Sequence, residues 1–420
     1  MSGARGVTEV AGSARIPASR RTPAGRIRVA NVITGLRAGA GGITLRGALA
    51  LDPERYTTTI LAAEGGTLID RAEEAGLEVI QLRHMSIGRG FYPWTDSRAF
   101  REVATHLEAR GFDLVHTHST KAGALGRLAA RRVGVPTVIH SFHGFPFHEF
   151  QSPVVRGALQ TVERRLARIT DYFLTDGTIV AAEAVRLNIA APDRIRAIAS
   201  PVDNVPRVSE GTRRESRRLL GIPAEAKLIG TAGRLEAQKA PLDMVKAVAS
   251  MGRDDVYVVW AGDGPLRAKM ERLIDRSGLH DRFLLLGERR DVPALLPGFD
   301  VFAMSSLFEG LPCAIVEAMS CGIPVVATAV NSVPEIVVPG KTGLVVKPSD
   351  PASLGRALAY LLDHPGEAAR MAEAARVHIG DRFRPEVLGR DLHEVYEIAA
   401  RLSSARLSSA HVLSAAAGAR

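Results

Sequence analysis

The chain has 420 residues, more than one hydrophobic core usually supports, so its length predicts two domains. Its composition, 46% hydrophobic and 24% charged, is that of a folded globular protein and excludes a disordered or collagen-like chain. Aromatic residues make up only 5% of the chain, so we expect no nucleic-acid binding through base stacking, although the net charge is +9.

The positive charge is concentrated in the N-terminal half of the chain. Residues 1–200 carry a net charge of +8, which leaves +1 for the remaining residues. A positive field of this kind attracts anionic lipid, an anionic substrate or nucleic acid, or serves only to keep the protein soluble.

Cysteine usage and hydropathy indicate the compartment. Cys313 and Cys321 lie within one stretch that is expected to be helical, a spacing that suits neither a disulfide framework nor a zinc site. Residues 1–25 contain arginines but no continuous apolar run, and we expect a disordered tail there. No segment approaches the roughly 18 apolar residues of a membrane span, so we expect a cytoplasmic protein.

Residues 26–200 alternate short apolar runs with helical segments, a pattern that predicts a parallel sheet with helices on both faces. The predicted strands are, in chain order, 26–34, 57–63, 77–82, 112–118 and 136–142. Residues 152–170 predict a long helix, because apolar residues recur there at spacings of three and four.

Residues 201–226 are rich in Pro, Ser and Arg and predict a connection between two domains. A second alternating series follows, with strands predicted at 227–233, 256–262, 283–287, 301–306, 324–328 and 342–346. The helices from 351 onward are expected to close this domain at residue 402, and the Ser/Ala-rich residues 403–420 to form a tail.

The predicted fold is therefore α/β, with two tandem doubly wound Rossmann-like domains, 26–200 and 227–402. Open sheets of this kind bind ligands beyond the carboxyl ends of their strands. We expect the site to lie in a cleft between the two domains.

The most informative segment is residues 305–328, SSLFEGLPCAIVEAMSCGIPVVAT. A strand ends before Glu309, a turn follows at Gly310 and Leu311, and a helix then begins. The N–H groups at the start of such a helix form a seat for a phosphate. Glu309 and Glu317 can both face one bound molecule. One carboxylate could then accept hydrogen bonds from sugar hydroxyls and the other from ribose hydroxyls.

This segment resembles the donor-site signature of the retaining glycosyltransferases of family 4, which have the two-domain GT-B fold. The resemblance implies that Glu309 contacts the transferred sugar, that the backbone amides of Gly310 and Leu311 bind the diphosphate, and that Glu317 binds the ribose. It covers residues 26–400 and is strongest over 229–346. It also implies that the domain 26–200 binds the acceptor and that the domain 227–402 binds a nucleotide-sugar donor.

A second motif, residues 231–245, places Arg234 and Lys239 just beyond a predicted strand. Two cations at a strand end can neutralise a pyrophosphate leaving group as its charge grows. The motif resembles the family pattern in which an arginine and a lysine contact the donor phosphates, but it carries Ala240 where glycine is usual and one extra residue before the lysine.

In the first domain, Gly41 and Gly42 follow the first predicted strand and open a helix, which lets a backbone approach a ligand closely. Members of the family carry a Gly-Gly turn here, near the donor phosphate and sugar. An alternative is dinucleotide binding, because Gly39, Gly41 and Thr44 nearly fit G-x-G-x-x-G and Glu64 ends the second strand.

Five histidines gather between residues 116 and 148, but their spacings match no metal-ligand template, and we expect no metal site. His143 follows a predicted strand and resembles the family histidine that reaches toward the transferred sugar. A neutral imidazole there can hydrogen-bond a hydroxyl or stabilise an oxocarbenium-like state. His116 and His118 are candidates for acceptor contacts or for packing.

Together these features predict a metal-independent enzyme without a cofactor, a retaining glycosyltransferase that moves a hexosyl unit from a nucleotide diphosphate sugar. The expected acceptor is a carbohydrate or a lipid-linked glycan, and the expected process is the synthesis of cell-surface glycan or exopolysaccharide. Two alternatives stay open, a nucleotide-sugar epimerase of the same fold and a non-catalytic glycan-binding protein.

The predicted helix over residues 154–169 combines an apolar stripe with Arg156, Arg164, Arg165 and Arg168. Basic amphipathic helices can rest on anionic leaflets, so peripheral contact with the cytoplasmic face of a membrane is one expectation. The alternative is an ordinary core helix whose arginines are solvated.

Overall fold

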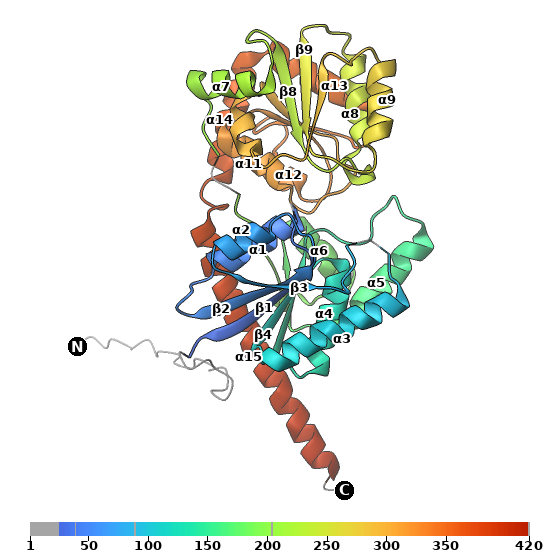
Figure 1. The fold of residues 1–420 in the computed structure, drawn as a ribbon, viewed down its shortest axis with the longest axis vertical. Coiled ribbons are helices and arrows are strands. Elements are labelled where there is room, and N and C mark those ends of the chain that lie inside the picture. The colour runs from blue at the N-terminus through green and yellow to red at the C-terminus, as the bar shows by residue number, and fades with distance from the viewer. Residues whose placement is uncertain (1–24, 38, 88–89, 203–204, 419–420) are drawn as a thin grey trace, which may run out of the picture.

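The computed structural model describes residues 25–37, 39–87, 90–202 and 205–418, and its elements are arranged in two α/β domains (Figure 1). The predicted tail 1–25 lies outside the described residues, except for Gly25. Both domains contain a parallel sheet, as the alternation of strands and helices predicts. The α/β fold class with two Rossmann-like domains is confirmed.

The first domain contains a seven-stranded sheet with strand order β3-β2-β1-β4-β5-β6-β7. Its strands are β1 (Ile27–Gly35), β2 (Tyr56–Ala63), β3 (Glu78–Leu82), β4 (Leu114–His118), β5 (Thr137–Phe142), β6 (Tyr172–Thr175) and β7 (Ile195–Ala197). All five predicted strands are present, and β6 and β7 extend the sheet beyond them. The central strands β4 and β5 are buried throughout, as expected for parallel strands that are covered on both faces.

The second domain contains a six-stranded sheet with strand order β10-β9-β8-β11-β12-β13. Its strands are β8 (Lys227–Ala232), β9 (Val256–Ala261), β10 (Phe283–Gly287), β11 (Val301–Met304), β12 (Val325–Thr328) and β13 (Leu344–Val346). All six correspond to predicted strands. The order reverses between β8 and β11, so the carboxyl ends of these two strands flank the crevice where ligands bind in such sheets.

Helices cover both sheets. In the first domain they are α1 (Ala40–Ala50), α2 (Ile69–Glu74), α3 (Pro93–Arg110), α4 (Thr120–Arg132), α5 (Pro153–Ala167) and α6 (Thr178–Arg186). In the second domain they are α7 (Glu210–Leu220), α8 (Pro241–Ser250), α9 (Arg267–Arg276), α10 (Val292–Leu295), α11 (Cys313–Cys321), α12 (Val333–Ile336), α13 (Pro351–Asp363) and α14 (Pro365–Ile379).

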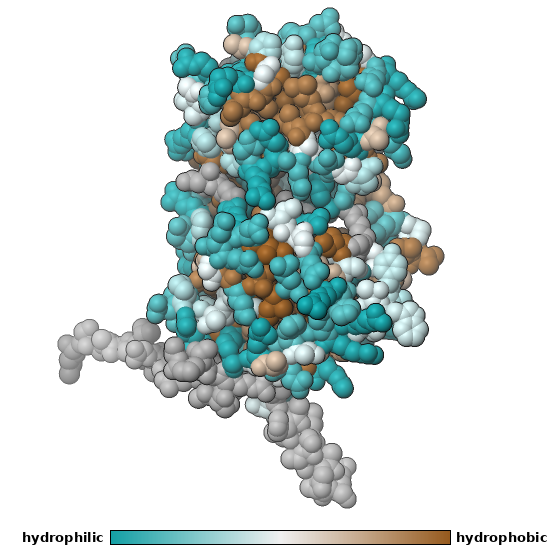
Figure 2. Space-filling view, in the orientation of Figure 1, coloured by the Kyte–Doolittle hydropathy of each residue, from teal (hydrophilic) through white to brown (hydrophobic). Residues whose placement is uncertain are grey.

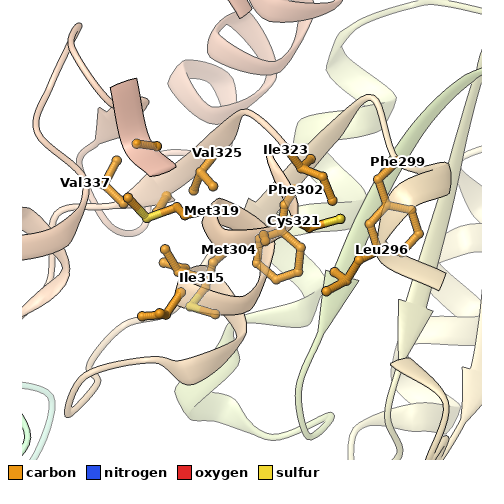
Figure 3. Close-up of a cluster of buried hydrophobic side chains, with 14 of the residues drawn as sticks. Leu296, Phe299, Phe302, Met304, Ile315, Met319, Cys321, Ile323, Val325 and Val337 are labelled. Atoms are coloured by element: carbon orange, nitrogen blue, oxygen red, sulfur yellow. The ribbon is translucent and has the colours of Figure 1, made fainter. Parts of the chain in front are cut away.

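The helix α11 illustrates how the second domain is held together. Its side chains Ile315 and Met319 are fully buried and lie against Phe302 and Met304 of β11 (Figure 3). Gly322 ends the helix in the left-handed conformation, with φ 91°, which a glycine adopts without strain. Packing of α11 against β11 and β12 thereby fixes the turn that precedes it, which contains Glu309.

The last helix, α15 (Pro385–Gly418), differs from the prediction. Instead of closing the second domain and ending in a tail, it crosses back and packs on the first domain (Figure 1). Leu388 and Leu392 join the core around β1, and Gly389 allows a close crossing with α1, because a Cβ there would lie 2.2 Å from the carbonyl oxygen of Ala50. The apolar periodicity predicts the helix but cannot say which sheet it covers.

The predicted connection 201–226 also contains a helix of the second domain. α7 begins at a capping box, in which the side chains of Ser209 and Thr212 each accept a hydrogen bond from the other residue's backbone N–H. The helix ends at Gly221, which has φ 65°. Leu220 and Ile222 pack in the core of the second domain. The connection is therefore shorter than its Pro- and Ser-rich composition predicts.

Candidate functional site

In the second domain, the predicted residues Glu309 and Lys239 meet at the carboxyl ends of β11 and β8. Glu309 is only 7% exposed, and its Oε1 lies 2.6 Å from Nζ of Lys239 and 2.6 Å from Oγ of Ser306. The Glu309 backbone N–H donates to Oδ1 of Asn331 at 2.8 Å. These contacts hold the carboxylate in one orientation beside a fixed positive charge.

The loop that carries Lys239 accommodates Ala240 at the position where the family usually has glycine. Ala240 has φ 43°, in the left-handed region where glycine is favoured. Holding an alanine there costs about 1 kcal/mol, and the Ser305 hydroxyl stabilises the turn by donating to the carbonyl groups of Lys239 and Ala240. Lys239 therefore reaches Glu309 although the usual glycine is absent.

Arg234 also lies at the end of β8, but its surroundings differ from those of Lys239. Its side chain is 59% exposed, and Nη1 pairs with Oε1 of Glu236 at 2.7 Å. The structure thus places the two predicted cations in different environments, one within the Glu309 cluster and one at the surface.

Gly310, Leu311 and Glu317 follow in the turn and in α11. A Cβ at Gly310 would lie 2.9 Å from the carbonyl carbon and oxygen of His143, so the backbones of the two domains touch there. The Leu311 side chain is buried in the core of the second domain, which leaves only its backbone for a ligand. Glu317 is half-buried, one turn after Cys313.

In the first domain, His143 stands in a chain of hydrogen-bonded side chains from four neighbouring strands. Its Nδ1 lies 3.1 Å from both carboxylate oxygens of Asp176, and its Nε2 lies 3.0 Å from Nδ1 of His118. The other ring nitrogen of His118 lies 3.0 Å from Oδ1 of Asn31. Both ring nitrogens of His143 are therefore engaged, and a hydrogen bond from its ring to a sugar hydroxyl would have to replace one of these two contacts.

The histidines behind His143 are neutral. Burial lowers the pKa of His118 well below its ordinary value, and burial lowers the pKa of His116 to about 3. His116 bonds the hydroxyls of Ser141 and of Tyr396 from α15. A cavity of ≈ 40 Å³ lies among these residues, which is enough for water. His116 and His118 are thus packed inside the first domain.

Gly41 and Gly42 lie in the first turn of α1, and both are buried. A Cβ at Gly41 would lie 3.0 Å from the carbonyl carbon of Leu36, so this glycine is required by the turn of its own chain. A Cβ at Gly42 would face the guanidinium of Arg46, which in turn lies 3.6 Å from Sγ of Cys313 on α11. Burial raises the pKa of the Cys313 thiol to about 11, so this contact is not a thiolate pair.

The sequence did not single out four residues of the two clusters, namely Asn31, Asp176, Ser306 and Asn331. Asp176 follows β6, a four-residue strand that was not predicted. Asn331 has φ 42°, a conformation that asparagine tolerates better than most residues, but it lies in a loop without a motif. An Asp or Asn directly after a short apolar run is the signal that could have found Asp176.

The described residues contain neither a metal-binding cluster nor a membrane-spanning helix. No group of three or more His, Cys, Asp or Glu side chains there is placed to hold a metal ion. No helix in the same ranges is both long and apolar enough to cross a bilayer.

Two sequence families match the chain. The family described as "Glycosyl transferases group 1" matches residues 212–378, and the family described as "Glycosyl transferase 4-like domain" matches residues 38–201. The two matches fall on the second and the first domain.

Curated relatives cover most of the chain. It is 29% identical to UDP-Gal:alpha-D-GlcNAc-diphosphoundecaprenol alpha-1,3-galactosyltransferase of Escherichia coli, over 80% of this chain and 88% of the relative. It is 32% identical to 2-deoxystreptamine glucosyltransferase of Streptomyces kanamyceticus, over 64% of this chain and 73% of the relative. Neither alternative, an epimerase or a non-catalytic glycan-binding protein, finds support in these comparisons.

Solved structures share the fold. Anabaena HepE in complex with UDP and glucose superposes with a TM-score of 0.77 at 20% identity, over 88% of this chain and 99% of that one. WaaG, a glycosyltransferase involved in lipopolysaccharide biosynthesis, gives a TM-score of 0.70 at 17% identity, over 88% and 99%. Together with the family matches, these likenesses show that the chain belongs to the group 1, GT4-type glycosyltransferases, enzymes with a sugar-nucleotide donor and the two-domain GT-B fold.

Proposed function

We propose that the protein is a retaining hexosyltransferase that moves a hexosyl unit from a nucleotide diphosphate sugar to a carbohydrate or lipid-linked acceptor. The observation that carries this proposal is the buried pair of Lys239 and Glu309, which lies where the Gly310 backbone meets His143 of the first domain. One carboxylate and one ammonium thus stand at the junction of the two domains.

In this proposal the donor lies along the second domain. Its diphosphate is bound by Arg234, by Lys239 and by the amides of Gly310 and Leu311, and its ribose by Glu317. These groups supply positive potential where charge develops on the leaving phosphate, so no metal ion or other cofactor is required. Glu309 contacts the transferred sugar, and Lys239 beside it neutralises the charge of its carboxylate.

The proposed reaction proceeds on one face of the sugar. The bond from the anomeric carbon to the phosphate oxygen breaks, and the bond to the acceptor oxygen forms on the same side. The acceptor proton passes to the departing phosphate. This route needs no nucleophile from the enzyme, which fits the described clusters, because the Glu309 carboxylate is engaged by Lys239 and Ser306 and the Asp176 carboxylate by His143.

Two of the similar proteins favour a uridine nucleotide. The E. coli relative is named for UDP-Gal, and the solved Anabaena HepE holds UDP. We therefore propose a UDP-hexose as donor and the synthesis of cell-surface glycan or exopolysaccharide as the process.

A panel of UDP-galactose, UDP-glucose, UDP-N-acetylglucosamine and GDP-mannose, followed by mass spectrometry, tests the donor. We expect slow release of free nucleotide from one UDP-hexose without acceptor, and NMR of the glycoside formed with an added sugar acceptor should show the same anomeric configuration as the donor. An inverted product contradicts retention, an epimerised donor supports the epimerase, and no turnover with the whole panel contradicts the proposed donor class.

Of the two proposed acceptor classes, the surface of α5 favours the lipid-linked one, because that surface could contact a membrane. Of its predicted apolar stripe, Leu166 is buried, whereas Val155 and Val162 are 49% and 45% exposed. Val154 is 81% exposed at the start of the same helix, and Arg165 and Arg168 are exposed near its end. Apolar side chains flanked by arginines favour peripheral contact with the anionic cytoplasmic leaflet.

Sedimentation with phosphatidylglycerol vesicles at low salt tests this contact. We expect binding by the protein and its loss when Arg165 and Arg168 are replaced with Gln. Arg164 is kept, because its Nε donates to the carbonyl of Leu187 and supports the fold. Replacing Arg214 and Arg218 of α7 removes the same charge from the second domain and should leave binding intact. No binding by the unmodified protein contradicts the membrane proposal.

A further inference from the structure

A carboxylate of the second domain caps a helix of the first. Glu335, on α12, accepts three hydrogen bonds from the first two residues of α6. Its Oε2 lies 2.8 Å from the backbone nitrogen and 2.8 Å from Oγ1 of Thr178, and its Oε1 lies 2.7 Å from the backbone nitrogen of Ile179. We call this contact between Glu335, Thr178 and Ile179 the interdomain cap.

The chemistry of the interdomain cap favours an ionised carboxylate. The first N–H groups of a helix have no partner within the helix, and the helix dipole attracts negative charge to that end. Burial acts to raise the pKa of Glu335, but the hydrogen bonds from Ile179 and Thr178 hold that pKa below its ordinary value. The two domains are thus joined by a charge and its hydrogen-bond donors.

The fit at this point is close. A Cβ at Gly177 would lie 2.1 Å from Oγ of Ser332 and 2.9 Å from Oε1 of Glu335. Only glycine at position 177 lets the loop after β12 reach the start of α6. The close approach at Gly177 is thus part of the contact between the two domains.

Both sides of the interdomain cap lead directly to the candidate site. In the first domain, Thr178 is two residues after Asp176, whose carboxylate accepts from Nδ1 of His143. In the second domain, Glu335 is four residues after Asn331, whose side chain accepts the backbone N–H of Glu309. The short segments 176–179 and 331–335 thus connect the interdomain cap to His143 and Glu309.

We propose that Glu335 is a positioning residue for glycosyl transfer: by capping α6 it closes the two domains and brings His143 and Glu309 into register across the cleft. Its effect on turnover rests on the function proposed above, but the contact itself does not. Other contacts across the cleft include the stacked rings of His148 and Phe308, with centroids 4.0 Å apart, and the Arg46 guanidinium 3.6 Å from Sγ of Cys313. Loss of the charged cap should therefore shift the protein toward open forms, and turnover should fall with the closed fraction.

Hydrogen exchange of the ligand-free, full-length protein tests the contact directly. Because the amides of Thr178 and Ile179 have no acceptor within α6, their protection reports on Glu335. In Glu335→Ala we expect the peptide that begins α6 to exchange at least about 10-fold faster, with a smaller increase in Glu335→Gln, which keeps the side-chain size. Unchanged exchange in both variants overturns the proposal.

Asp350→Ala is the matched control. Asp350 also caps a helix with its carboxylate, accepting from the backbone N–H of Ser353 at 2.9 Å and from its hydroxyl at 2.7 Å, but both residues belong to the second domain. This variant should leave the exchange of α6 unchanged. Faster exchange of α6 in this variant would show that general destabilisation, and not the interdomain cap, sets the protection, and would overturn the proposal.

Kinetics with the nucleotide sugar identified by the donor panel tests the positioning role. Glu335→Ala should lower kcat about 10-fold or more while the donor KM changes less than about threefold, and Thr178→Val, which keeps both backbone donors, should have a smaller effect. Faster exchange with unchanged kcat overturns the positioning role. If the unmodified protein turns over no donor, the proposed function fails, and the exchange experiment still decides whether the contact forms.

Discussion

The two clusters at the cleft differ in how they are built. In the second domain, Glu309 and Ser306 come from one short segment, and Lys239 reaches them from the neighbouring strand end as a charged partner. In the first domain, His143 and Asp176 belong to a chain of side chains from four separate strands, with neutral imidazoles behind them. In the proposed function, the second domain supplies charge for the leaving phosphate, and the first supplies a fixed hydrogen-bonding array for hydroxyls.

This difference has a physical origin. A phosphate needs compact positive potential, which one loop and one helix start can supply. Hydroxyl recognition needs several donors and acceptors in fixed directions, which rigid strand ends supply better than a single loop. If the comparison is right, substitutions in the second domain should act mainly through charge, and those in the first mainly through geometry.

The largest effect is expected for Arg234→Ala in the second domain. Removal of one cation from the developing charge of the leaving group should lower kcat/KM about 100-fold, roughly 3 kcal/mol. Steady-state kinetics of the folded variant measures this. Arg218→Ala is the control, because Arg218 on α7 is also exposed and pairs with Glu215 as Arg234 pairs with Glu236. Equal activity of the two variants would remove Arg234 from the donor site.

A smaller effect is expected for Asp176→Asn in the first domain. An amide holds His143 less firmly than the carboxylate, whose two oxygens both lie 3.1 Å from Nδ1. Loss of this orientation should lower kcat about 10-fold, with little change in UDP affinity. The comparison between kcat and the calorimetric affinity for UDP separates the two quantities. Weaker UDP binding with unchanged kcat would mean that this cluster serves the donor and not the reacting groups.

Glu317→Gln should act on binding rather than on turnover. An ionised acceptor makes a stronger hydrogen bond to a ribose hydroxyl than an amide does, so UDP affinity should fall about fivefold, on the order of 1 kcal/mol. Titration calorimetry with UDP measures the loss. Equal affinities for both proteins would give Glu317 a structural role on α11.

The smallest effect is expected for removal of metal ions. Because Arg234, Lys239 and the start of α11 provide the positive potential, excess EDTA should leave the rate of donor turnover unchanged. The rate before and after dialysis against EDTA is the measurement. Complete inhibition that added Mg²⁺ or Mn²⁺ reverses would show that the second domain does not suffice to neutralise the leaving group.

Most elements of the fold were predicted from local patterns. The six strands of the second sheet and five of the first appear where apolar runs alternate with helical periodicity. The strands β6 and β7 were not predicted, although β6 has as many residues as β11 and β7 as many as β13, and both of those strands were predicted. In the candidate site, Glu309 and Lys239 were identified from motifs, whereas Asp176 and Asn331 lie in loops that carry no motif.

The sequence by itself determined the fold class, the two-domain organisation and the residues at the strand ends of the second domain, because these depend on spacing within short segments. Only the tertiary structure decided that α15 packs on the first domain, that Lys239 pairs with Glu309, that both ring nitrogens of His143 are occupied and that Glu335 caps α6. Each of these depends on contacts between residues far apart in the chain, and a side chain shows its preference for burial or for a partner without showing which partner the folded chain brings to it.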